Sequence, residues 1–162
     1  MTTQRFNLVT QWRLDAPIAA VWAALIAVEA WPDWWRAVRR VELIEPGDAG
    51  GLGAVRRMTW RTALPYTLTF TTRTSRIEPM TAIEAQASGE LDGVGLWTLR
   101  AEGGGTLARY DWRVELGRPW MRALAPVLRP VFAWNHGVVM GWGEADLARH
   151  LVRPQAGRPG AA

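Results

Sequence analysis

The chain has 162 residues, of which 49% are hydrophobic and 21% charged, and its formal net charge is +4. This high apolar content with a small net charge excludes an intrinsically disordered chain, and the length corresponds to one domain. The chain has no cysteine, no run of ~18 apolar residues and no signal-like N-terminus, so we expect a cytoplasmic protein without disulfides.

The first predicted elements are a strand and two short helices. Residues 4–14 alternate between apolar and polar side chains, which is typical of a half-buried strand. Asp15 is a candidate N-cap just before a proline, and it predicts a helix over Ile18–Val28. The motif Trp31-Pro32-Asp33 begins a second short helix, which is expected to run to about Arg40.

Six further strands follow, because the hydrophobic period is two from Val41 to Leu116 and turns interrupt it. The expected strands are Val41–Glu45, Ala54–Thr62, Tyr66–Ile77, 81–91, Val94–Glu102 and Thr106–Leu116. Gly103-Gly104-Gly105 predicts a hairpin between the last two. Such short connections indicate an antiparallel meander with one covered face.

The C-terminal part returns to a helical period. Trp120–Leu128 is predicted to be helical, Pro126 and Pro130 to bend or interrupt the helix, and Val131–Leu151 to form a long closing helix. The tail Arg153–Ala162 is rich in Pro, Gly and Ala and is expected to be disordered.

This order of elements predicts an α+β fold. A twisted sheet must cover its apolar face, and the closing helix is the element long enough to do so. We therefore expect a strongly curved, antiparallel seven-stranded sheet wrapped around the C-terminal helix, with two short helices after the first strand. Residues 1–152 would form this single domain.

Several stretches of the chain are distinctive: LDAPIAAVWAALIAVEAWPDWW, WRTALPY, ASGELDGVG, YDWRVEL and NHGVVMGWGEADLARHL. The first is similar to the opening of the helix-grip (START-like, SRPBCC) superfamily, and the others resemble its polyketide cyclase/dehydrase-like branch. The resemblance covers about residues 4–152 and implies the helix-grip fold, with a deep, mostly apolar cavity between sheet and C-terminal helix. The superfamily includes aromatase/cyclases and lipid and quinone carriers, but it has no universal catalytic motif, so no catalytic residue is assigned.

The inward faces of the strands would line this cavity. On strand 81–91 the inward residues are unusually small, which either makes room for neighbouring tryptophans or leaves a hollow. These small residues are Ile83, Ala85, Ala87 and Gly89. The ligand contacts that we predict from the sheet are Arg56, Met58, Trp60, Tyr66, Phe70, Tyr110 and Trp112. The two tyrosines face inward and either donate a hydroxyl to a ligand carbonyl or satisfy a backbone group.

Arg56 has several alternative partners. It shares its strand face with Met58 and Trp60, so alternation points it inward. There it would bind an anionic or polyoxygenated ligand or pair with Asp146, or its guanidinium would extend to water.

The closing helix contributes an apolar stripe with two polar residues in it. The apolar members are Val131, Phe132, Val139 and Trp142. Asn135, Val139 and Trp142 complete the predicted ligand-binding set. Because a polar residue in a buried stripe needs a partner, Asn135 either bonds a strand carbonyl or meets the ligand. Asp146 lies one turn from the helix end, where it either has such a role or reaches solvent.

The residues for covalent, metal and nucleotide chemistry are missing. All 19 basic residues are arginine, which excludes a lysine Schiff base. His136 and His150 are too few for a metal site without carboxylates, and there is no nucleophile elbow, phosphate loop or dinucleotide fingerprint. We therefore expect no cofactor and no metal. Outward arginines alternate beside acidic residues on the sheet, so no nucleic-acid partner is expected.

The first functional hypothesis is a binding protein for a hydrophobic small molecule that is aromatic, polyketide-like or isoprenoid-like. The alternative is a polyketide cyclase or dehydratase that works by conformational control and carbonyl polarisation. A further alternative is a lipid or quinone carrier that docks on membranes through Trp31, Trp34 and Trp35, although packing is expected for at least two of these. Membrane contact is not favoured, and the ligand and the oligomeric state are left open.

Overall fold

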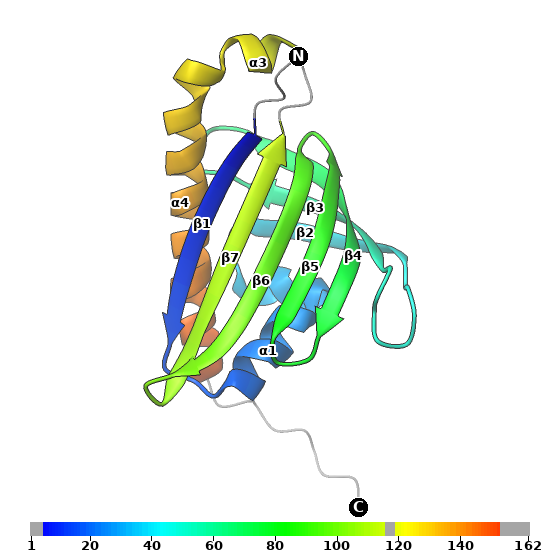
Figure 1. The fold of residues 1–162 in the computed structure, drawn as a ribbon, viewed down its shortest axis with the longest axis vertical. Helices are drawn as coiled ribbons and strands as arrows, with labels where there is room; N and C mark the ends of the chain where they lie inside the picture. Colours follow the sequence, from blue (N-terminus) through cyan, green and yellow to red (C-terminus); the bar gives the residue numbers. More distant parts are fainter. Residues whose placement is uncertain (1–4, 116–118, 153–162) are drawn as a thin grey trace, which may run out of the picture.

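The computed structural model describes residues 5–115 and 119–152 (Figure 1). The elements are β1 (Arg5–Leu14), α1 (Ile18–Ile26), the 3-10 turn η1 (Val28–Ala30), α2 (Trp31–Trp34), β2 (Val38–Glu45), β3 (Val55–Arg61), β4 (Thr67–Glu78), β5 (Ala82–Gly89), β6 (Asp92–Glu102), β7 (Gly105–Glu115), α3 (Pro119–Ala123) and α4 (Ala125–Val152). The predicted disorder of Arg153–Ala162 and the predicted end of the last strand at Leu116 lie outside the described residues. Within the described part, no helix is both long enough and apolar enough to span a membrane.

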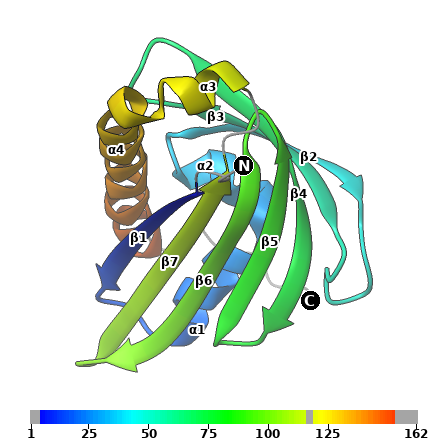
Figure 2. The same ribbon diagram turned by 45° about the horizontal axis from the view of Figure 1, so that its top comes forward.

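The seven strands form one antiparallel sheet in the order β1-β7-β6-β5-β4-β3-β2. β1 joins the meander by pairing with β7, from Arg5 opposite Glu115 to Leu14 opposite Thr106. The sheet curves around the helices without closing, and α4 runs along its open side (Figure 2). The predicted helix-grip fold is therefore confirmed.

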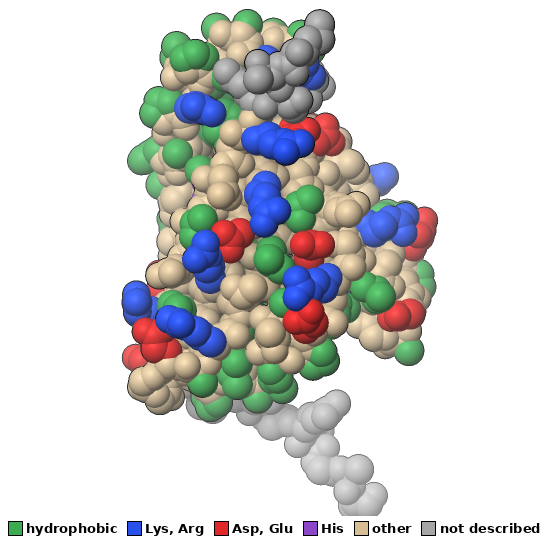
Figure 3. Space-filling model, in the orientation of Figure 1, with side chains coloured by type: hydrophobic (Ala, Val, Ile, Leu, Met, Phe, Trp, Pro, Cys, Tyr) green, Lys and Arg blue, Asp and Glu red, His purple; other side chains and the backbone are tan. Residues whose placement is uncertain are grey.

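The alternation predicted from the sequence places apolar side chains on the inner, buried face of the sheet and polar side chains on its outer face. In β1, Phe6, Trp12 and Leu14 are buried while their neighbours Arg5 and Arg13 are exposed. The outer face carries arginines mixed with acidic residues (Figure 3). Pairs on this face include Arg5–Glu115, Arg76–Glu78 and Arg109–Asp111.

Three predicted boundaries and one predicted cap are wrong. α1 begins at Ile18 as predicted, but it ends at Ile26 rather than Val28, and no side chain, Asp15 included, caps its start. The second helix ends at Trp34 because Trp35 adopts an extended conformation, with φ −98° and ψ 104°. The chain then enters β2 at Val38, which pairs with Trp60 in β3, so the strand starts three residues before the predicted Val41.

α4 continues through Pro130, so the predicted interruption is also wrong. Pro126 lies in the first turn of the helix, where a backbone N–H has no partner within the helix in any case. Pro130 lies one turn later and removes a single hydrogen bond, the one to the carbonyl of Pro126. The cost is confined to the N-terminal end, and the rest of the helix is intact.

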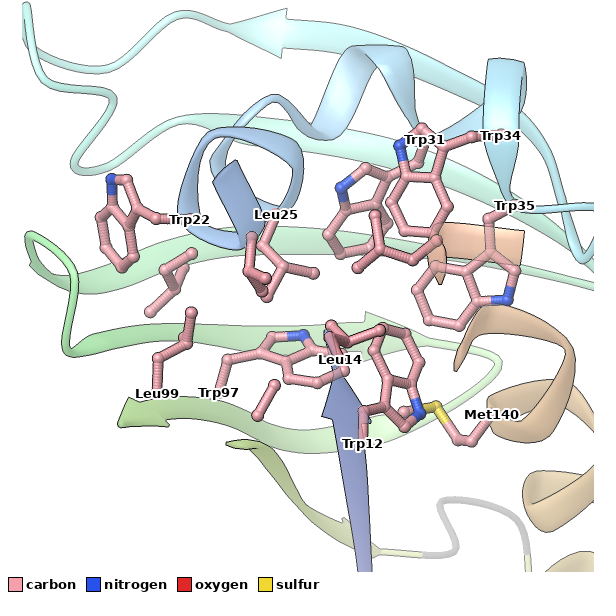
Figure 4. Close-up of a cluster of buried hydrophobic side chains, with 14 of the residues drawn as sticks. Trp12, Leu14, Trp22, Leu25, Trp31, Trp34, Trp35, Trp97, Leu99 and Met140 are labelled. Carbon is pink, nitrogen blue, oxygen red and sulfur yellow. The ribbon is translucent and has the colours of Figure 1, made fainter. Parts of the chain in front are cut away.

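Tryptophans dominate the core between α1, α2, α4 and the sheet (Figure 4). The ring centroids of Trp12 and Trp97 are 4.6 Å apart, those of Trp12 and Trp35 are 5.3 Å apart, and Trp34 stacks on Trp35 at 5.5 Å. Trp31, Trp34 and Trp35 are 8%, 8% and 1% exposed. They pack in the core, so the suggestion that these three form a membrane anchor is wrong.

Hydrogen bonds from separate elements hold α4 against the sheet and α2. The amide of Arg13 in β1 donates to Glu144 Oε1 (2.9 Å), and Trp35 Nε1 donates to the Val139 carbonyl (3.1 Å). Near the C-terminal end, Asp146 is 5% exposed and accepts from the backbone and side chain of Arg36. The expectation that Asp146 reaches solvent is therefore wrong.

Candidate ligand-binding cavities

Two neighbouring cavities lie between the sheet and the helices. The first, here called the α4 cavity, has a volume of about 130 Å³ and is walled by α4 together with β1, β3, β4 and β7. The second, the α1 cavity, has a volume of about 80 Å³ and lies among α1, η1, α2 and β3–β7. The α4 cavity approaches the size of the roughly 150 Å³ apolar cavity in another protein that stays dry and binds benzene.

An aromatic wall separates the two cavities, because four side chains line both of them. They are Trp60, Phe70, Tyr110 and Trp112. Phe70 stacks on Trp60 with centroids 6.3 Å apart and planes 6° apart, and Tyr110 stacks on Trp112 at 6.1 Å and 16°. β3, β4 and β7 supply these rings by their period-two alternation, so the wall is a direct product of the strand pattern.

Eight of the ten predicted ligand-binding residues lie in these cavity walls. The four wall aromatics are joined by Asn135 and Val139 in the α4 cavity and by Arg56 and Met58 in the α1 cavity. The small residues Ile83, Ala85 and Ala87 also line the α1 cavity, which favours the hollow over the filled alternative.

Tyr66 and Trp142 lie outside both walls. Tyr66 precedes β4 and is 39% exposed, so its predicted inward position is wrong. Burial and the charge of Glu90 raise the pKa of its hydroxyl. Trp142 is half-buried, with the guanidinium carbons of Arg36 and Arg61 6.0 and 5.8 Å from its ring. Its place on the helical wheel is therefore the border of the buried stripe.

Arg56 is buried as predicted, but its partners are different. Its side chain is 11% exposed, its Nε lies 2.9 Å from Glu29 Oε1, and its Nη1 donates to Thr74 Oγ1 at 3.2 Å. Neither the pairing with Asp146 nor the extension to water is found. Because Glu29 neutralises it, Arg56 presents a compensated charge to the α1 cavity.

Asn135 has a structural contact and a cavity position at the same time. It is 6% exposed, and its Oδ1 accepts a hydrogen bond from the Ala63 amide (2.8 Å) in the turn between β3 and β4. The predicted structural alternative was a bond to a strand carbonyl, whereas the observed partner is a loop N–H. The residue therefore fastens α4 to the β3–β4 turn at the edge of the cavity.

His136 is a cavity-lining residue that the predicted ligand-binding set does not include. It lines the α4 cavity, and its ring is nearly parallel to that of Tyr110, at 6.3 Å and 14°. Its Nε2 and the Nε1 of Trp60 are buried without a hydrogen-bond partner in the described part of the chain. The spacing could have revealed it, since His136 follows Phe132 by four residues and precedes Val139 by three.

Burial sets the protonation states of the polar groups here. It lowers the pKa of His136 from 6.5 to about 4, so the imidazole is neutral at pH 7. Burial also raises the pKa of Tyr110 far above its ordinary value, so the phenol keeps its proton. The hydroxyl of Tyr110 occupies the space beside Gly95 that a Cβ atom would need.

The described wall of the α4 cavity therefore offers mainly neutral hydrogen-bonding groups, and its charged residue is the exposed Arg61. No Asp or Glu lines it, and no cluster of three metal-ligating residues exists among the described residues. Such a site suits binding and orientation of an apolar molecule with a few polar atoms.

Acidification is expected to destabilise the fold through His136. Between about pH 6.5 and pH 4 the unfolded chain binds a proton at this histidine and the folded chain does not, so stability falls as pH falls through that window. The full shift corresponds to roughly 3 kcal/mol. Urea unfolding measured from pH 7 to pH 4.5 should show this slope. His136→Leu should flatten the slope and His150→Leu should keep it, whereas an unchanged slope in His136→Leu would contradict the assignment.

The comparisons with known proteins agree with this geometry. Residues 5–154 match the family model described as polyketide cyclase / dehydrase and lipid transport. No curated protein matches the sequence. Similar solved structures include the Zhui aromatase/cyclase of Streptomyces sp. R1128, at 16% identity, with 96% of this chain and 100% of that chain covered and a TM-score of 0.74.

Two other solved structures have comparable similarity. A START superfamily protein of Mycobacterium smegmatis is 14% identical over 90% of this chain and 96% of its own, with a TM-score of 0.74. The protein TTHA0849 of Thermus thermophilus is 14% identical over 90% of this chain and 99% of its own, with a TM-score of 0.73. At these identities the structures support the fold alone.

Proposed function

The chain belongs to the polyketide cyclase/dehydrase and lipid transport family, and we propose that it binds an uncharged aromatic, polyketide-like or isoprenoid-like molecule in the α4 cavity. The observation that carries the proposal is an apolar cavity of about 130 Å³ whose wall holds Tyr110 and His136 side by side. The ligand would also contact Phe70, Trp112 and Val139.

The charges around the cavities favour an uncharged ligand. Arg56 is already paired with Glu29. Arg61 lines the α4 cavity, but its side chain is exposed and its guanidinium carbon lies 5.8 Å from the ring of Trp142, outside the cavity wall. His136 is neutral at pH 7 because burial lowers its pKa to about 4. The groups that remain include the Tyr110 phenol, which would donate from beside Gly95 at the border with the α1 cavity, and an imidazole nitrogen of His136, which would accept. They fit a ligand that carries a carbonyl or hydroxyl oxygen.

The second candidate is a cyclase that uses the same cavity, and the description of the family as polyketide cyclase / dehydrase favours it. In this reaction the cavity would hold a flexible polyketone in a folded conformation while the Tyr110 hydroxyl hydrogen-bonds the carbonyl that is attacked. A pKa of about 4 makes His136 a weak base, because general bases work best with a pKa near the working pH. Binding is therefore the function that the geometry supports best. A lipid or quinone carrier is a variant of it.

Titrations with 1-naphthol and naphthalene test the proposal, because the two ligands differ by a single hydroxyl. We expect one molecule per chain and a preference for naphthol of about fivefold, as one net hydrogen bond provides. Val139→Trp should fill the cavity and abolish binding of both ligands. Val152→Trp, at an 81% exposed position of the same helix, is the matched control and should bind normally.

Tyr110→Phe separates ligand recognition from packing. It removes only the hydroxyl, so naphthalene should bind as before while the preference for naphthol disappears. If Val139→Trp binds as tightly as the wild type, the ligand does not occupy the α4 cavity and the proposal fails.

The physiological ligand can be identified separately, by native mass spectrometry of the purified chain and organic extraction of any bound molecule. Conversion of that molecule on incubation with the protein would favour the cyclase.

A further inference from the structure

The exposed tryptophans are confined to one face of the molecule. Nine of the 11 tryptophans are buried or half-buried, whereas Trp120 and Trp134 are both 56% exposed. Leu124, Val127 and Val131 lie between them and are 49%, 69% and 38% exposed. These five residues, here called the apolar ridge, follow α3 and the first turns of α4, where hydrophobic side chains gather at the upper left of Figure 3.

The ridge lies in a stretch of the chain that has no negative charge. Between Glu115 and Glu144 the sequence contains no Asp or Glu, although the chain has 15 of them. The described part of this stretch includes two exposed arginines, Arg122 and Arg129. An apolar helical face with tryptophans and arginines and without acidic residues has the composition of a helix that lies in a membrane interface.

The ridge and the α4 cavity share the same helical turns. Phe132, Asn135 and His136 face the cavity, whereas the neighbouring Val131 and Trp134 face outward. The predicted place of Val131 in the buried stripe is therefore wrong. The guanidinium carbon of Arg129 lies 5.1 Å from the ring centroid of Phe6, which is itself a residue of the cavity wall. Whatever covers the ridge therefore lies one helix thickness from the cavity.

We propose that the apolar ridge docks on an anionic lipid bilayer. The five apolar side chains would enter the interfacial region, and Arg122 and Arg129 would contact lipid phosphate and carboxylate groups. This docking stands on the surface alone and does not require the proposed ligand. If both hold, the bilayer lies directly against the helix that walls the α4 cavity, and an apolar ligand has a short path between lipid and protein.

Charge argues against a second copy of the chain as the occupant. A two-fold interface pairs the same patch on both subunits. Such pairing would place Arg122 and Arg129 of one copy near those of the other, and the ridge segment contains no acidic residue to compensate them. An anionic bilayer would bring to this surface the negative charge that a second copy of the ridge segment lacks.

Vesicle flotation tests the proposal with the full chain. The wild type should float with vesicles of phosphatidylcholine and phosphatidylserine and bind vesicles of phosphatidylcholine alone about tenfold or more weakly. Trp120→Ser/Trp134→Ser should lower binding to the anionic vesicles by about tenfold or more. Arg122→Gln/Arg129→Gln should have a comparable effect and should remove the salt dependence of binding.

Leu43→Ser/Ile44→Ser is the matched control, because both residues are exposed apolar side chains (47% and 50%) on β2, at the opposite edge of the sheet. It should bind vesicles like the wild type, and thermal unfolding of each variant should show an intact fold. The proposal is overturned if the wild type does not float with anionic vesicles, or if the control variant loses as much binding as the tryptophan variant. Sedimentation showing a dimer that Trp120→Ser/Trp134→Ser dissociates would assign the ridge to a second copy instead.

Discussion

Gly143→Ala is expected to lower the free energy of unfolding by about 2 kcal/mol, although alanine is the better helix former. A Cβ atom at this position of α4 would lie 2.5 Å from Trp35 Cε2 and 2.6 Å from Trp12 Cζ2. Both rings are fully buried and pack against each other, so neither can move away without disturbing the core. Overpacking of this kind costs about 3 kcal/mol and outweighs the roughly 1 kcal/mol gained in helix propensity.

Two other glycines of α4 provide the control. Nothing lies within 4 Å of a Cβ atom built at Gly137 or Gly141. Replacing either by alanine should therefore raise the free energy of unfolding by about 0.5–1 kcal/mol. Urea denaturation should therefore show a lower free energy of unfolding for Gly143→Ala and a higher one for Gly137→Ala and Gly141→Ala. A stabilised Gly143→Ala protein would show that α4 does not pack on the tryptophans as described.

Asp146→Asn should cost about 2–3 kcal/mol of stability. The carboxylate is 4% exposed and accepts the Arg36 backbone amide (3.0 Å) and the Arg36 guanidinium at Nη2 (2.7 Å). Arg149 contacts it as well. The asparagine keeps the shape but loses the charge, and its amide group faces guanidinium groups that can only donate.

Two further measurements test the role of Asp146: the acid dependence of wild-type stability, and the stability of the control variant Asp111→Asn. Burial alone would raise the pKa of Asp146, but the hydrogen bonds and charge of Arg36, with the charge of Arg149, lower it overall. The stability that these contacts of ionised Asp146 provide is present above the ordinary aspartate pKa and is lost as pH falls through the lowered pKa of Asp146. Asp146→Asn should lack this acid-dependent loss of stability. Asp111 pairs with Arg109 on the outer face of the sheet, so Asp111→Asn should change stability by less than about 0.5 kcal/mol. Equal losses in both variants would contradict the special role of Asp146.

The sheet could be predicted because its signals are local. Alternation along β1 separates Phe6 and Trp12 from Arg5 and Arg13, and tertiary structure had only to choose which face is covered. The ends of elements were less predictable. Whether the chain after Trp34 continues as helix depends on Val38 pairing with Trp60, which no local pattern reveals.

In the candidate site, too, the residues set by local alternation could be predicted, and those that depend on tertiary contacts could not. Residues on strands, such as Met58, Phe70 and Trp112, line the cavities because period two places them without ambiguity. Residues on α4 were harder, because a helical wheel has a border on each side of its stripe. Trp142, which was predicted to bind ligand, lies outside the cavity wall, whereas His136, which was not, lies in it. The partner of Arg56 was beyond prediction, since Glu29 lies 27 residues earlier in the chain.

The tryptophan cluster also affects how the folding of this protein can be followed by spectroscopy. Indole rings held 4.6 to 5.5 Å apart at fixed angles, as in Trp12–Trp97, Trp12–Trp35 and Trp34–Trp35, couple their electronic transitions. Such exciton coupling adds bands to the far-ultraviolet circular dichroism that do not come from the backbone. A spectrum of this protein therefore reports side-chain packing together with helix and strand content. Loosening of the core would change the spectrum before any hydrogen-bonded element melts.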